Sequence, residues 1–273
     1  MKNLKIILVC LFLSTITFFS CGDISDPLVS DTDEPYNEPS DELYDGPYDI
    51  DEPYNFPLKP GMPEWADLKS VTEMVDTLQI PQDILRRMTT RGLLETCLNY
   101  PLFGDIGFYN SPKVGMEMLI AHYFNGFPEL LKRKDAYTYL SEKFILFDPL
   151  INEEWSLLEE GTYTFELVKI ELLLAQDIVL ESASDESKVL LLKETILKYE
   201  KMLTQKDNYS FFHYEQLFFL MGKVLLKSGN PDISSLVVNN KEISSFLKTG
   251  RLRNYDVVNE ILFIIKKILM EEK

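Results

Sequence analysis

Side chains able to do acid–base or nucleophilic chemistry are few in this chain. Of its 273 residues, two are histidine and three are cysteine. His122 and His213 each have apolar residues one helical turn away, a pattern typical of packed, hydrogen-bonded histidines, and neither has an Asp or Glu at the one-turn spacing of a helical metal site. Cys97 falls in a leucine stripe and is expected to be a core residue. We therefore expect no catalytic, cofactor-binding or metal-ligating residue among them.

Charged groups give only general indications. Acidic residues outnumber basic ones by 44 to 27, and the formal net charge of −17 argues against a nucleic-acid partner. Adjacent acids such as Glu153-Glu154 point about 100° apart on a helix and are expected to be solvated. The basic groups Arg86-Arg87-Arg91 and Lys132-Arg133-Lys134 could bind an anion, or could lie near helix C-termini, where the helix dipole favours cations. No nucleophile elbow or phosphate-binding glycine loop is present.

The first 20 residues are typical of a lipoprotein signal peptide. Lys2 and Lys5 make a basic start, and the apolar run that follows is too short to cross a hydrocarbon core of roughly 30 Å. Cys21 comes directly after this run, an arrangement that resembles the lipobox of bacterial lipoproteins. The resemblance implies that Cys21 carries the lipid (palmitate) anchor and becomes the mature N-terminus. Asp23 and Asp26 resemble the surface-export signals of Bacteroidetes lipoproteins, which implies a cell-envelope protein of the outer membrane that faces outward.

Residues 21–63 differ in composition from the rest of the chain. Between residues 22 and 64 the chain holds 13 Asp or Glu, one basic residue and eight of its 14 prolines. The run Asp-Glu-Pro-Tyr-Asn occurs twice, at 33–37 and at 51–55. Because like charges repel and proline breaks regular structure, this composition predicts a disordered acidic tether that ends near residue 63.

From residue 64 onward, apolar residues recur at three- and four-residue spacing, which predicts an all-α domain over 64–273. Helices are expected at 63–78, 81–88, 90–99, 112–125, 135–147, 161–181, 184–203, 209–227 and 256–270, with shorter ones from 128 and between 231 and 255. Short connections and the absence of a fixed repeat predict an irregular array of antiparallel helical hairpins. A boundary between two subdomains is conceivable near 148–152, at Asp148-Pro149.

A pattern in the first part of this domain has a further implication. It consists of Ile80-Pro81, Leu85, Met88-Thr89, Cys97-Leu98-Asn99-Tyr100-Pro101-Leu102, Asn125-Gly126, Glu129-Leu130, Arg133 and Ala136. The pattern resembles a segment of uncharacterised secreted proteins of Bacteroidetes and covers less than a third of the chain. The group has no assigned activity, so the resemblance implies compartment and lineage but no catalytic residue and no cofactor.

The sequence therefore favours a lipid-anchored, non-catalytic helical module that binds an envelope protein or a glycan. Trp65, Trp155 and the aromatic residues of 100–109 could line a sugar or peptide groove. The alternative is an envelope hydrolase that uses carboxylates brought together by folding. A cluster of Asp or Glu with raised pKa in a deep cleft would favour that alternative.

Overall fold

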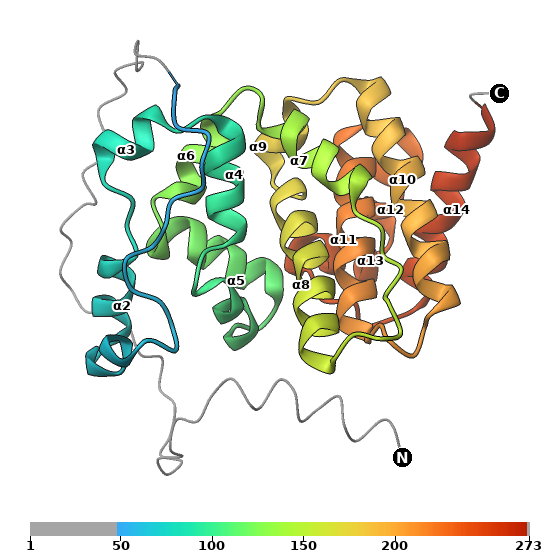
Figure 1. Ribbon diagram of the computed structural model, residues 1–273. Helices are drawn as coiled ribbons and strands as arrows, with labels where there is room; N and C mark the ends of the chain where they lie inside the picture. The colour runs from blue at the N-terminus through green and yellow to red at the C-terminus, as the bar shows by residue number, and fades with distance from the viewer. Residues whose placement is uncertain (1–47, 272–273) are drawn as a thin grey trace. The chain divides into compact units, whose positions relative to one another are not determined.

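The computed structural model describes residues 48–271, and helices dominate this part of the chain (Figure 1). The helices are η1 (Pro63–Asp67), α2 (Val71–Thr77), α3 (Gln82–Arg87), α4 (Thr90–Leu98), η2 (Phe103–Phe108), α5 (Pro112–Met118), η3 (Leu119–Tyr123), α6 (Gly126–Lys132), α7 (Ala136–Leu146), α8 (Leu157–Leu174), α9 (Asp177–Glu181), α10 (Asp185–Thr204), α11 (Phe211–Lys227), α12 (Pro231–Asn239), α13 (Lys241–Thr249) and α14 (Asp256–Glu271). The prediction of an all-α fold is confirmed, since no strand occurs within the described residues. The signal peptide, Cys21 and the tether as far as residue 47 lie outside those residues.

Successive helices pack as pairs, as the short connections predict. α7 contacts α8, α10 contacts α11, and α12 contacts α13. The most enclosed helix is α11, which also contacts α8, α9 and α14 and buries both Phe218 and Phe219. A Cβ placed on Gly222 of this helix would lie 2.5 Å from Leu247 Cδ2, so the Leu247 side chain of α13 packs directly over this glycine. No helix within residues 48–271 has the length and apolar character needed to cross a bilayer.

The last part of the predicted tether is folded, so the boundary predicted near residue 64 is wrong. Residues 48–56, called the strap below, lie against α3 and α4 and appear as the blue end of the ribbon in Figure 1. Ile50 forms an isolated parallel bridge with Met88, and the Phe56 side chain is only 3% exposed. Ile50, Tyr54 and Phe56 are spaced by even numbers, which places their side chains on one face of an extended chain. This face turns toward the core, despite the acidic residues between.

The expected break near 148–152 does not divide the domain. Residues 48–271 belong to one compact unit, and buried residues from both halves belong to one hydrophobic core. The Tyr209 hydroxyl donates to the Pro149 carbonyl, and the Gln205 side chain makes two hydrogen bonds of 2.7 and 3.0 Å with the backbone of Ile151. These bonds fix the connection to α10 and α11.

Two predicted helices also differ from the structure, and the first, expected over 63–78, is divided into η1 and α2. The single helix expected over 161–181 begins earlier, at Leu157, and is interrupted after Leu174 before α9. Its start is a capping box, in which the Ser156 side chain accepts from the Glu159 N–H while the Glu159 carboxylate accepts from the Ser156 N–H. The Ser-X-X-Glu signal was present in the sequence and could have corrected the prediction.

Hydrogen bonds between Ile80 and Asn125 hold the first helices together. The Asn125 side chain accepts a hydrogen bond from the Ile80 N–H at 3.0 Å and donates one to the Ile80 carbonyl at 2.8 Å. The Gln79 side chain in turn accepts from the Asn125 N–H at 3.0 Å. Because all these polar groups are partly buried, leaving any one unpaired would be costly. Their structural role is thus explained without a ligand.

Candidate functional site

A hollow lies between the C-terminal end of α7 and one face of α10. Its volume is about 290 Å³, and it is lined by Ile145, Leu146, Phe147, Asp148, Glu194, Leu197, Lys198 and Lys201. Two apolar side chains of this lining are open to solvent, Leu146 at 75% and Leu197 at 50% exposure. Charged side chains of both signs surround them. An apolar centre with a polar rim is the usual composition of a protein-binding surface.

Lys198 is the buried cation of this hollow. Its ammonium group donates to the carbonyls of Phe147 and, at 3.5 Å, Ile145, and lies 4.8 Å from the centre of the Phe144 ring. Burial lowers the pKa of Lys198 to about 8, a value that would suit a lysine base or nucleophile. The hydrogen bonds instead use its donors to satisfy backbone carbonyls at the end of α7. Lys198 therefore fixes the wall of the hollow.

Three carboxyl groups of the described residues have a raised pKa. Glu171 on α8 is 1% exposed, neither of its carboxyl oxygens has a hydrogen-bond partner, and burial raises its pKa well above the usual range. Burial also raises the pKa of Asp105 in η2 to about 6, and that of Glu215 on α11, which accepts from the Leu252 N–H at 2.7 Å. None of the three lines the hollow, and no other carboxylate contributes to any of these shifts.

The part of the chain that the structure describes contains no group of side chains suited to bind a metal ion. No three His, Cys, Asp or Glu side chains come together there in a way that could hold an ion. Cys97 is fully buried, and burial raises the pKa of its thiol, as expected for a core cysteine.

The two histidines differ from each other. The prediction that His122 is packed is wrong, since it is exposed on the π-helical turn η3. A π turn adds a residue to the helical repeat, so the spacing from Met118 no longer predicts the same face. The prediction for His213 is confirmed: its ring lies edge-on to Tyr209, and its Nδ1 accepts from the Ser210 N–H at 3.1 Å.

A pH dependence of stability follows from His213. Burial lowers its pKa in the folded state to about 4, below the usual 6.5. The unfolded chain therefore takes up a proton as the pH falls through 6.5, whereas the folded chain does not until about pH 4, so stability is lost across this window. The loss from this group is about 3 kcal/mol. In His213→Gln, which can keep the capping hydrogen bond, urea unfolding between pH 7 and 4 should show a correspondingly smaller loss. If the free energy of unfolding fell equally with pH in the wild type and in His213→Gln, the prediction would be contradicted.

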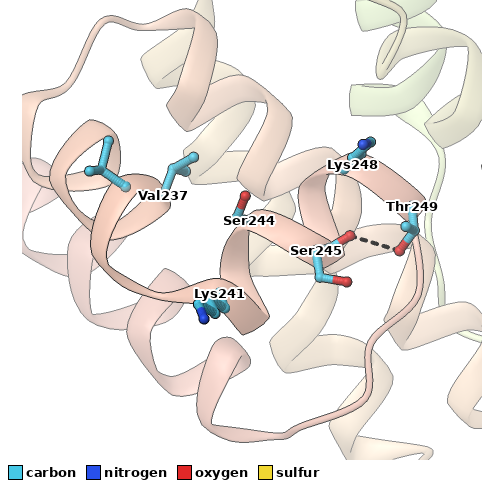
Figure 2. Close-up of a pocket in the computed structure, with 7 residues that line it drawn as sticks. Val237, Lys241, Ser244, Ser245, Lys248 and Thr249 are labelled. Atoms are coloured by element: carbon cyan, nitrogen blue, oxygen red, sulfur yellow. Dashed lines mark hydrogen bonds between the residues drawn. The ribbon is translucent and has the colours of Figure 1, made fainter.

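A second hollow, of about 420 Å³, lies between α12 and α13 (Figure 2). Ser244 and Ser245 lie along α13 between Lys241 and Lys248, and Val237 faces them from α12. The two lysine ammonium groups, with the serine hydroxyl groups between them, could bind an anion. The Asn240 side chain already accepts from the N–H groups of Glu242 and Ile243 at the start of α13. These two N–H groups are therefore not available to bind an anion.

The basic groups singled out in the sequence lie largely where the helix dipole favours them. Arg86 and Arg87 are in the last turn of α3, and Lys132 is in the last turn of α6. Arg87 pairs with Asp49, and Arg133 pairs with Glu129 at 2.7 Å. These pairs neutralise two of the six basic residues.

The aromatic residues proposed to line a groove divide into two sets. Tyr100 is buried and stacks on Phe124 with 4.5 Å between ring centres, so it belongs to the core. Trp155 lies 4.8 Å from Tyr163, which stacks at 4.5 Å on Phe147 of the α7–α10 hollow. This row extends the hollow toward the start of α8.

No family model, curated protein or solved structure matches this chain. The α7–α10 hollow, with its exposed leucines and adjoining aromatic row, is the candidate site that the residues themselves indicate. The sequence identified Trp155 but not Tyr163, Phe147, Leu146 or Leu197, because the hollow is formed by elements about 50 residues apart.

Proposed function

We propose that this chain is a lipid-anchored protein of the cell envelope whose helical domain binds a partner protein or glycan without catalysis. The observation that carries the binding proposal is the exposure of Leu146 and Leu197 in a hollow rimmed by charges. Leaving apolar surface in water is unfavourable, so a surface of this kind is best explained by a partner that covers it. Anchoring rests on the signal-like segment that ends at Cys21. Outer-membrane location and kinship with Bacteroidetes lipoproteins belong to the same proposal.

The arrangement of ionisable groups supports binding over hydrolysis. A glycosidase needs two carboxyl groups facing each other across its substrate. The carboxyls with raised pKa lie on η2, α8 and α11, outside the lining of the hollow. The carboxylates that do line it, Asp148 and Glu194, belong to its rim, and Asp148 is paired with Lys201 at 3.0 Å.

Leu197→Glu is expected to reduce partner capture from an envelope extract by at least tenfold, because it places a charge in the apolar centre of the hollow. Leu190→Glu is the matched control, since Leu190 is 48% exposed on the same helix but does not line the hollow. Tagged chains would be compared by affinity capture and mass spectrometry. A Cys21→Ala arm should abolish fatty-acid labelling and release the protein from membranes while its capture profile is retained.

Two results would contradict the proposal. Equal loss of capture in Leu197→Glu and Leu190→Glu would remove the hollow as the binding surface. Turnover by the purified chain that a single Asp or Glu substitution abolishes would favour the hydrolase.

A further inference from the structure

The strap is bound to α3 and α4 mainly through its backbone, as an extended peptide ligand would be. The N–H groups of Asp49 and Ile50 both donate to the Arg87 carbonyl, at 2.9 and 3.1 Å, and the Ile50 carbonyl accepts from the Thr89 N–H at 2.8 Å. Further along, the Tyr54 N–H donates to Thr96 Oγ1 at 2.8 Å. The strap site is defined here as Arg87, Thr89, Gly92 and Thr96.

Acidic side chains add specificity to this backbone recognition. The Asp49 carboxylate makes two hydrogen bonds with the Arg87 guanidinium, of 2.9 and 2.8 Å, and Asp51 Oδ1 accepts from the Thr89 hydroxyl at 2.6 Å. A Cβ placed on Gly92 would lie 2.7 Å from the Asp51 carbonyl oxygen. Glycine at this position is therefore required for α4 to accept the strap so closely.

Aromatic residues complete the contact. Phe56 is almost fully buried, and Tyr54 is partly buried with its ring 5.3 Å from that of Phe56. Glu52 and Pro53 are exposed. The domain thus binds the strap through the carboxylates of Asp49 and Asp51, the backbone N–H of Tyr54 and the buried ring of Phe56.

The same pattern recurs in the chain 18 residues upstream. The strap reads Asp-Ile-Asp-Glu-Pro-Tyr-Asn at 49–55, and residues 31–37 read Asp-Thr-Asp-Glu-Pro-Tyr-Asn. Both acids that bind the strap site and the tyrosine have counterparts, in Asp31, Asp33 and Tyr36. The main difference is Glu38 at the position of Phe56, which removes the apolar anchor.

We propose that the strap site recognises this seven-residue pattern and that its second occupant is residues 31–37 of another copy of the chain, which exchange with the strap. Because the second occupant lacks the buried phenylalanine, it binds more weakly than the strap, and the association is transient. The proposal deepens the proposed function, since lipid anchors would confine many copies to one membrane surface and raise their effective concentration.

Photo-crosslinking of the full mature chain tests this proposal. A benzophenone side chain would replace Glu34, whose counterpart Glu52 is exposed, and two differently tagged copies would be mixed in solution. We expect cross-links between copies that map to α3 and α4, at low yield. In Glu38→Phe, which restores the anchor and leaves the strap and the domain unchanged, the yield should rise at least tenfold. In Glu42→Phe, the control for added hydrophobicity outside the pattern, it should not rise.

Adding Asp33→Asn to Glu38→Phe should lower the yield again, because the counterpart of the Asp51–Thr89 contact is weakened. Equal yields in Glu38→Phe and Glu42→Phe, cross-links that map elsewhere, or cross-links confined to single copies would overturn the proposal. All samples carry Cys21→Ala, so the result does not depend on the lipid anchor and is separable from failure of the proposed function.

Discussion

Replacing Phe56 by alanine should lower the free energy of unfolding by about 3 to 5 kcal/mol, the usual cost of deleting a buried phenyl ring. The side chain is 3% exposed, and its ring centre lies 5.7 Å from that of Phe124 and 6.1 Å from that of Tyr100. Alanine would leave a cavity among these rings. Urea unfolding followed by tryptophan fluorescence measures the change.

Tyr48→Ala is the matched control for this change. Tyr48 belongs to the same strap but is 51% exposed, with its ring over Arg133 at 4.3 Å, so its loss should cost at most about 1 kcal/mol. Had residues 48–62 been part of a disordered tether, as their composition predicts, both substitutions would leave stability unchanged. A change below about 1 kcal/mol in Phe56→Ala would therefore restore the tether prediction for this segment.

The strap shows why composition misled the prediction of the domain boundary. Over residues 22–64 acidic residues and prolines dominate any average, and three apolar side chains at even spacing do not alter it. The residues that make the strap fold lie elsewhere in the chain: Thr96, which pairs with the Tyr54 N–H, is 42 positions away. Whether an extended segment finds such partners depends on tertiary structure, which local patterns do not contain.

Helices were predicted well because their information is local. Thr89 and Ser111, which directly precede the helices predicted from 90 and 112, each accept the hydrogen bond of an N-cap, and apolar spacing identified the long helices α10 and α11. Apolar spacing was a poorer guide to the buried face of α10, since Leu203 continues the three- and four-residue spacing of Leu192, Ile196 and Tyr199 but is 46% exposed. The α7–α10 hollow could not be predicted, because Leu146 and Leu197 come to line one hollow only after the intervening helices α8 and α9 have packed.

Substitution of Glu171 by leucine should raise the free energy of unfolding by about 2 to 3 kcal/mol at pH 7. The carboxyl group is buried and neither of its oxygens has a hydrogen-bond partner, which is costly in an apolar interior. Leucine fills a similar volume with apolar atoms. Urea unfolding of both proteins gives the difference.

The stabilisation of the folded state by Glu171→Leu should increase as the pH rises. Burial raises the pKa of Glu171 above its usual 4.5, although the positive charge of Lys198 lowers it in part. Above pH 4.5 the unfolded chain releases the proton that the folded chain still holds, so the wild-type protein loses stability as the pH rises toward the folded-state pKa. Glu171→Leu lacks this loss. Glu171→Gln, which cannot ionise but keeps a buried polar group, should remove the pH-dependent part and gain less at pH 7.

A loss of stability in Glu171→Leu would mean that attraction between an ionised Glu171 and Lys198 outweighs the cost of burying both charges. In that case an ionised Glu171 would help to keep Lys198 charged, because a negative charge on Glu171 raises the pKa of Lys198. The two substitutions distinguish these cases. If the pair were charged, Glu171→Gln would destabilise the protein as well, because it removes one of the carboxylates that stabilise the buried ammonium group. If the acid is protonated, both variants are more stable than the wild type above pH 7, and the carbonyls of Phe147 and Ile145 hold Lys198 without a charge on Glu171.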